Sequence, residues 1–426
     1  MTTAERRNNS PICFSLFRYK LINYGKNGFK KNGGIVVKKL LFGFIVFAVS
    51  LTIMMPPSAF ANHHKVPDLA KQSLSAILIE RDTGHVLFEK ESNKELPPAS
   101  MTKIMTMLLI MEALDEKKIS LQDQVRASKH AASMGGSQIF LEEGEEMTVE
   151  DLLKGVAIAS ANDASVALAE YIAGSEEVFV EMMNERAKEL GLKNTHFVNS
   201  TGLPAKNHYS SAHDMAMMAK ELLKHEEITR YTSIYEDYLR EDSDNKFWLV
   251  NTNRLVKFYP GVDGLKTGYT SEAKYCLTAT AKKGNMRTIA VVMGAPTPKD
   301  RNRQISEMLD YAFNRFTVHN IYDSGEEIRQ VKVSKGNKSH LTVLTGDKIS
   351  ILTEKGESIE NVKPKIEMKS TVSAPIKKGE TVGKLVLEKD GEILSETPLL
   401  SAEDVEKASV WQMFKRMMAQ FAAKSD

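Results

Sequence analysis

The sequence predicts an α+β fold in which an antiparallel sheet is flanked by helices, with a small all-β domain after it. Two hairpin patterns, at 75–90 and 275–294, alternate apolar and polar residues, and mostly helical patterns lie between them. Apolar residues then recur at helical spacing from Ile305 to Phe316, which gives one stripe suited to packing on a sheet. Because each layer must cover the apolar face of another, this order of elements predicts helices on the sheet and a helical lobe from the middle of the chain.

An apolar run over residues 104–114, free of glycine and proline, predicts a helix buried in the centre of this domain. Ser100 and Lys103 open it, and residues three apart share one helix face, so Lys103 lies beside Ser100. A serine hydroxyl is a poor nucleophile until a neighbour takes its proton. Lys103 can be that base if burial and a second cation lower its pKa. The same spacing recurs at Ser243, where the charged surroundings predict a solvated loop instead.

A second motif, Ser160-Ala161-Asn162, lies in the loop that enters a helix predicted over 164–173. A hydroxyl at this place can pass a proton to a leaving amine, while an amide orients the lysine or the substrate. The alternative is that Ser160 or Asn162 only caps the helix.

A third motif, Lys266-Thr267-Gly268, lies in a strand-like segment just before the second hairpin. Lys266 can supply the second cation, and Lys266 and Thr267 suit a carboxylate. Gly268 shares a strand face with Lys266, and a residue without a side chain lets a substrate backbone lie close to the strand. The three motifs in this order, rather than any one of them, predict a serine acyl-transfer site.

The first 61 residues read as a leader. Residues 40–55 are nearly all apolar, follow two lysines and precede an A-x-A pattern at 59–61, so we expect an export signal and a mature chain that starts at Asn62. The segment before this export signal is unusually long and basic, whereas residues 36–40 look like an ordinary signal start if a valine codon initiates, so we expect that residues 1–35 are not translated. The mature chain would carry 48 basic and 54 acidic residues, a net charge near −6, which does not favour a nucleic-acid partner. Cys13 leaves with the leader, so Cys276 is expected to be a lone, buried structural thiol.

The catalytic domain is expected over 62–320, and short alternating runs predict a small all-β domain over 321–400. The last segment, 401–426, places apolar residues on one helix face, at Val410, Met413, Phe414, Met417, Met418 and Phe421. Four positive side chains and no acidic one lie between positions 407 and 424. This pattern predicts an amphipathic helix that anchors the protein peripherally to the membrane surface. The alternative is a terminal helix docked on the β domain.

With these residues in hand, the chain closely resembles the low-molecular-mass penicillin-binding proteins that are serine-type D-alanyl-D-alanine carboxypeptidases. The resemblance covers the whole mature chain and looks closest to the sporulation-associated type of Gram-positive spore formers. It implies a penicillin-binding/β-lactamase-like fold and a location at the outer face of the cytoplasmic membrane. The implied substrate is a peptidoglycan stem pentapeptide, and β-lactam antibiotics, which imitate its D-Ala-D-Ala end, are implied ligands.

The resemblance also implies a role for each site residue. Ser100 would attack the carbonyl between the two D-alanines, with Lys103 as general base, Ser160 as proton relay and Asn162 holding the array. Lys266 and Thr267 would bind the terminal carboxylate, helped by Arg254, and the backbone N–H groups of Ser100 and Tyr269 would form the oxyanion hole. Ala161 replaces the aspartate of the usual S-D-N spelling, at a position whose side chain none of these roles requires.

Three other functions are weighed against this one. A serine β-lactamase would use the same motifs but needs neither the β domain nor the anchor. A non-catalytic wall-binding protein would have no need of three intact motifs. A zinc carboxypeptidase would need clustered ligands, whereas His208 and His213 stand five apart and do not match H-E-x-x-H. We therefore expect no metal and no cofactor.

Overall fold

The computed structural model describes residues 67–389 and 391–422. Its central feature is a five-stranded antiparallel sheet with the order β2-β1-β9-β8-β7. The strands are β1 (Ser75–Glu80), β2 (Val86–Lys90), β7 (Val262–Thr270), β8 (Lys274–Lys283) and β9 (Met286–Ala295). Both predicted hairpins are therefore confirmed, and the chain returns to pair β9 with β1 after the whole helical lobe. This pairing places the third motif, on β7, at one edge of the sheet.

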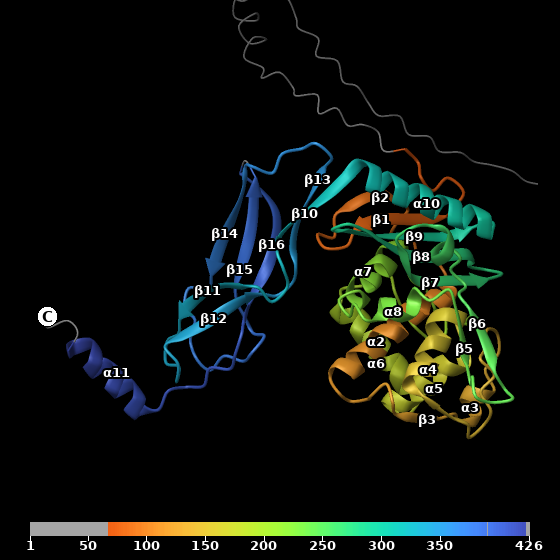
Figure 1. The fold of residues 1–426 in the computed structure, drawn as a ribbon, viewed down its shortest axis with the longest axis horizontal. Coiled ribbons are helices and arrows are strands. Elements are labelled where there is room, and N and C mark those ends of the chain that lie inside the picture. Colours follow the sequence, from red (N-terminus) through yellow and green to blue (C-terminus); the bar gives the residue numbers. More distant parts are fainter. Residues whose placement is uncertain (1–66, 390, 423–426) are drawn as a thin grey trace, which may run out of the picture. The chain divides into compact units, whose positions relative to one another are not determined.

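Helices cover both faces of this sheet (Figure 1). Successive side chains of a strand point to opposite faces, so Leu78 packs in the core under α10 (Pro298–Arg315), whereas Ile77 and Ile79 pack toward α7 (Ala212–Leu222). The predicted stripe of α10 is buried at Ile305, Met308, Leu309 and Ala312. A sheet buried on both faces gives rigid support to residues at its edge.

The helical lobe is built around α2 (Lys103–Asp115), which is buried almost all round, as its composition predicts. Helix α5 (Asn162–Ala173) packs against it and ends at Gly174, whose φ is +85°. The remaining elements of this region are η1 (Ala99–Thr102), β3 (Gln124–Arg126), α3 (Lys129–Ala132), β4 (Glu146–Thr148), α4 (Val149–Lys154), η2 (Gly155–Ala159), α6 (Glu176–Glu189), α8 (Ile228–Thr232), β5 (Glu236–Leu239), β6 (Phe247–Val250) and α9 (Leu255–Phe258). Ser243 is exposed on the turn between β5 and β6, so the solvated-loop prediction is confirmed.

The C-terminal part is all-β, as predicted, with sheets ordered β11-β12-β16-β15-β14 and β10-β13. Its strands are β10 (Phe316–Tyr322), β11 (Glu327–Lys332), β12 (His340–Thr345), β13 (Ile349–Glu354), β14 (Val362–Met368), β15 (Thr381–Lys389) and β16 (Glu392–Ser401). Sequence patterns missed β10, which follows α10 without a turn, and β14, whose polar residues obscure the alternation. The predicted boundaries at 320 and 400 fall inside β10 and β16, and this division of the chain stays a prediction.

Helix α11 (Val410–Ala422) is the last described element. Its side chains Val410, Trp411, Met413 and Phe414 are exposed, and Trp411 stacks on Phe414 with ring centroids 5.7 Å apart. Side chains from position 417 onward lie outside the description, as do the predicted leader, the cleavage site before Asn62 and Cys13. Within the described ranges, no helix is both long and apolar enough to span a bilayer.

Candidate active site

The candidate nucleophile, Ser100, is half-buried on the 3-10 turn η1, which leads into α2. Ala99 before it has a φ of +49°, in the left-handed region that residues with side chains rarely adopt. The turn is therefore held in an unusual conformation by its surroundings. Strand β7 packs against this turn so closely that a Cβ on Gly268 would lie 2.7 Å from the carbonyl oxygen of Pro98.

Lys103 is fully buried, and its Nζ lies within hydrogen-bonding distance of three oxygens. These are Asn162 Oδ1 at 2.6 Å, the Thr201 carbonyl at 2.7 Å and Ser100 Oγ at 3.3 Å. A neutral amine has two hydrogens and one lone pair. The two carbonyl oxygens can only accept, so they take both hydrogens, and the lone pair is left for the Ser100 hydroxyl.

The electrostatic surroundings of Lys103 also favour an amine that accepts the proton of Ser100. Its pKa is well below the usual lysine value, first because burial removes water from the ammonium and second because Lys266 is a nearby cation, while Asp163 opposes the shift. Lys266 is also buried, and its pKa is lowered to about 7 by burial and by Arg301. The lowered pKa of Lys103 favours the neutral amine that a general base requires.

The second motif lies where η2 gives way to α5. Ser160 has a φ of +65°, and its side chain lines the cleft, whereas the N-cap position of α5 is Ala161, without a side-chain hydrogen bond. The capping alternative is therefore wrong for both Ser160 and Asn162. The Asn162 amide instead donates from Nδ2 to the Gly135 carbonyl at 2.6 Å and accepts from Lys103.

Asp163 is a buried residue whose importance the sequence patterns did not reveal. Its carboxylate accepts backbone N–H bonds from Ile139, Leu141 and Ala164 at 2.9–3.1 Å. It thus fixes the segment at 135–141 against the start of α5. A first-turn acid is a common helix feature, so nothing in the sequence singled it out.

On β7, the third motif faces the nucleophile turn. Lys266 Nζ donates to the Thr267 carbonyl at 3.2 Å, and Thr267 Oγ1 donates to Thr252 Oγ1 at 2.7 Å. Gly268 was expected to make room for a substrate, but its closest neighbours are Pro98, Ala99 and Met101 of the chain itself. The exposed Tyr269 stacks on Tyr275, with ring centroids 4.4 Å apart.

A cavity of about 830 Å³ collects residues from all three motifs. Its lining includes Ser100, Ser160, Thr267, Gly268, Tyr269 and Arg254, while the buried Lys103, Asn162 and Lys266 stand behind this wall. The three motifs, at positions 100–103, 160–162 and 266–268, therefore meet at one cleft.

Arg301 also lines this cavity, although no sequence pattern pointed to it. It lies on the first turns of α10, is 7% exposed, and its pKa is lowered to about 10 by burial. In the sequence it belongs to the charged run at 299–303, which precedes the apolar stripe of the helix and reads as a solvated first turn. Together with Arg254 and Lys266 it makes this end of the cleft suited to an anion.

The other predicted features of the region are also placed. Cys276 is fully buried on β8, as predicted, and burial raises its thiol pKa to about 11, which disfavours the reactive thiolate. His208 bonds to Thr102 and to the Val198 backbone, and His213 pairs with Asp214.

A buried lysine with a lowered pKa beside a serine, together with a second hydroxyl and an anion-binding end, defines a serine acyl-transfer site of the penicillin-recognising type. Residues 61–297 match the family described as D-alanyl-D-alanine carboxypeptidase, and residues 316–407 match the C-terminal domain of penicillin-binding protein 5. The chain belongs to this D-alanyl-D-alanine carboxypeptidase family, as the resemblance in its motifs implied.

Individual relatives agree with this assignment. The chain is 61% identical to the D-alanyl-D-alanine carboxypeptidase DacF of Bacillus subtilis (strain 168), over 90% of this chain and 98% of that protein. It is 38% identical to DacC of Escherichia coli (strain K12), over 83% and 89% of the two chains. Among solved structures, penicillin-binding protein 5 from Haemophilus influenzae matches with a TM-score of 0.63 at 33% identity, over 79% of this chain and 98% of that one. Penicillin-binding protein D2 from Listeria monocytogenes in its cefotaxime-bound form matches with a TM-score of 0.52 at 30% identity, over 57% and 97%.

Proposed function

We propose that this chain is a serine-type D-Ala-D-Ala carboxypeptidase that removes the terminal D-alanine from peptidoglycan stem pentapeptides through an acyl-enzyme on Ser100. The observation that carries the proposal is the environment of Lys103. A buried amine that donates both hydrogens to carbonyl oxygens and directs its lone pair toward a serine hydroxyl is positioned to act as a general base. Family membership supplies the substrate class.

In the first half of the reaction, Lys103 takes the hydroxyl proton of Ser100 as Oγ attacks the carbonyl between the two D-alanines. The negative oxygen that develops is stabilised by the backbone N–H groups of Ser100 and Tyr269. Ser160 passes the proton to the leaving amine, so that D-alanine departs and an ester to Ser100 remains. Water then attacks this ester and loses a proton to the Lys103 amine, which passes it to the departing Ser100 Oγ, so that the shortened peptide and the free serine are released. Asn162 holds Lys103 in place throughout.

The terminal carboxylate of the substrate binds at the cationic end of the cleft. Thr267 offers a hydroxyl and Arg254 and Arg301 offer positive charge at the cleft wall, with the buried Lys266 behind them. Lys266 has a pKa of about 7 in the free cleft, and an incoming carboxylate favours its charged form. A β-lactam carries a comparable carboxylate next to its reactive carbonyl, and we expect it to acylate Ser100.

The test is release of D-alanine from a stem pentapeptide by the purified protein, compared with its Ser100→Ala variant. We expect release by the first and none by the second, together with labelling of Ser100 by a fluorescent penicillin. Rapid turnover of penicillin would instead favour a β-lactamase. Absence of both labelling and release would favour a non-catalytic wall-binding protein.

We further propose that the protein is exported, cleaved before Asn62, and held peripherally at the outer face of the cytoplasmic membrane by α11. The support is the exposed apolar row on α11 beside Lys415, whose Nζ lies 5.3 Å from the centre of the Trp411 ring. Truncation after Ala402 should move the protein from the membrane to the soluble fraction. A truncated protein that stays with the membrane would favour a helix docked on the β domain. The sporulation-associated subtype stays a prediction, which the timing of expression would test.

A further inference from the structure

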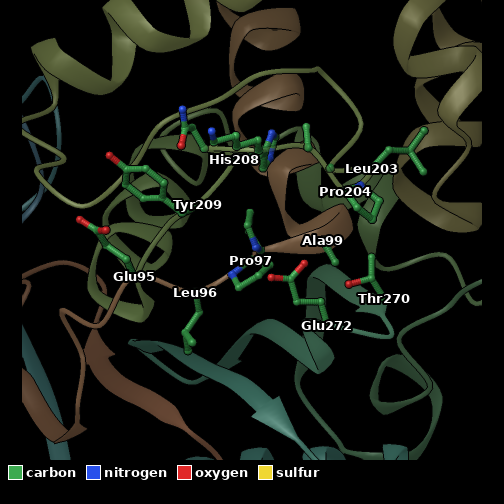
Figure 2. Close-up of a pocket in the computed structure, with 15 residues that line it drawn as sticks. Glu95, Leu96, Pro97, Ala99, Leu203, Pro204, His208, Tyr209, Thr270 and Glu272 are labelled. Atoms are coloured by element: carbon green, nitrogen blue, oxygen red, sulfur yellow. The ribbon is translucent and has the colours of Figure 1, made fainter.

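A chain of buried hydrogen bonds runs behind the nucleophile turn. His208 Nε2 lies 2.8 Å from Thr102 Oγ1, and Thr102 Oγ1 lies 2.9 Å from the carbonyl oxygen of Ala99, the residue before Ser100. His208 is 7% exposed and Thr102 is fully buried. Figure 2 shows His208 on a loop above Ala99 of the turn, and both residues line a second cavity of about 670 Å³.

The contacts fix the direction of both hydrogen bonds in the series from His208 through Thr102 to Ala99. The backbone N–H of Val198 donates to His208 Nδ1 at 3.1 Å, so Nδ1 must be the unprotonated nitrogen. The proton of the neutral ring is then on Nε2, which donates to Thr102 Oγ1, and the one proton of Thr102 donates to Ala99. Burial lowers the pKa of His208 to about 4, so the ring is neutral at neutral pH. Each of these protons has one acceptor, so no second arrangement of donors and acceptors satisfies all the contacts.

The loop that carries His208 also touches the turn and the base directly. A Cβ on Gly202 would lie 1.9 Å from the Ala99 carbonyl oxygen, which shows how closely the loop covers this group. The next residue back, Thr201, accepts the hydrogen bond from Lys103 Nζ. The same loop therefore holds both the left-handed residue before the nucleophile and the amine that must receive its proton.

We propose that His208 is a positioning residue that acts through Thr102 on the Ala99 carbonyl and keeps Ser100 Oγ within reach of Lys103. This inference rests on the proposed acyl transfer at Ser100. Ala99 stays in its left-handed conformation because its carbonyl oxygen is bonded from one side by Thr102 and covered by Gly202. Without the bond, the turn can relax, and Ser100 moves away from an amine that is already 3.3 Å distant.

The experiment compares variants of the full chain by the second-order rate of acylation with a fluorescent penicillin and by melting temperature. Thr102→Val keeps the shape but removes both hydrogen bonds, and His208→Leu removes the donor to Thr102. Each should acylate about ten- to a hundredfold more slowly, because small misplacements of reacting atoms carry penalties of that order. Thr102→Ser keeps the hydroxyl, and His208→Gln keeps an N–H donor, so both should stay close to the unmodified protein. His85→Gln, at an exposed histidine on the β1–β2 turn, is the matched control.

The double variant Thr102→Val/His208→Leu separates positioning from general loosening. Because the two groups act in series, it should be no slower than the slower single variant. The inference would be overturned if the rate losses of the two single variants multiplied in the double variant, if Thr102→Val acylated normally, or if Thr102→Ser acylated slowly. An unmodified protein that does not react with penicillin would instead refute the proposed function. A fall in melting temperature with an unchanged acylation rate per folded molecule would show that the hydrogen bonds of His208 and Thr102 only stabilise the fold, and would overturn the positioning role.

Discussion

Substitution of Gly268 by alanine tests the packing of β7 against the nucleophile turn. The added Cβ would lie 2.7 Å from the Pro98 carbonyl oxygen, 3.1 Å from Ala99 Cβ and 3.2 Å from the Met101 nitrogen. Ordinary contact begins near 3.4 Å, so strand and turn must separate by about 0.7 Å. All but one of these neighbours are backbone atoms, so no flexible side chain can move aside instead.

Such a separation moves Ser100 relative to both Lys103 and the Tyr269 N–H group. A misplacement of this size should slow acylation about ten- to a hundredfold, which corresponds to about 1.4–2.7 kcal/mol in activation free energy. Overpacking should also lower the free energy of unfolding by about 1–3 kcal/mol. The rate of penicillin acylation and a denaturant unfolding curve measure the two effects.

The matched control is Gly284→Asn on the turn between β8 and β9 of the same sheet. A Cβ there meets nothing within 4 Å, and asparagine tolerates its φ of +58°. This variant should acylate at the normal rate. If Gly268→Ala also acylates normally and is equally stable, the close approach of β7 to the turn does not set the geometry of Ser100.

Three further predictions concern charge. Lys266→Met removes a cation that lowers the pKa of Lys103, so the pKa of Lys103 should rise and the acid limb of the pH–acylation profile should move to higher pH. Because the pKa of Lys266 is about 7, the loss of rate should be largest below that pH, and an acid limb that does not move would contradict the coupling. Arg301→Leu should reduce the preference in kcat/KM for a peptide with a free C-terminal carboxylate over its amide by about tenfold, whereas Arg303→Leu, on the exposed side of the same helix, should leave it unchanged; equal preference in both variants would remove Arg301 from the carboxylate site. Asp163→Asn places an amide where backbone N–H groups now find a carboxylate, so the free energy of unfolding should fall by about 2–3 kcal/mol, and an unchanged denaturation midpoint would mean that these bonds contribute little.

The sequence patterns predicted the elements well where local periodicity is strong. The apolar run of α2, the stripe of α10 and both hairpins of the large sheet all lie where their spacing placed them. Strands β10 and β14 were missed because the first continues directly from a helix and the second carries lysines, a glutamate and a proline on an exposed surface. Local patterns report which face of an element is buried, and an exposed strand gives little such signal.

The candidate site divides in a similar way. Ser100, Lys103 and Lys266 could be named from the sequence, because Ser100 and Lys103 stand one helical turn apart at the start of an apolar run and Lys266 follows in a strand-like segment. The reason for Gly268 was different from the expected one, since its neighbour is the nucleophile turn. Arg301 and His208 carried no pattern of their own, and each reaches the site from an element distant in sequence from Ser100.

The sequence by itself determined which reactive groups this protein has and in what order of helices and strands they occur, because side-chain chemistry and periodicity are properties of neighbouring residues. Only the tertiary structure decided how those groups are tuned. The pKa of Lys103 depends on the loss of water around it and on Lys266, 163 positions further along the chain. Desolvation, charge from distant segments and close backbone packing exist only once the chain has folded, and no local pattern records them.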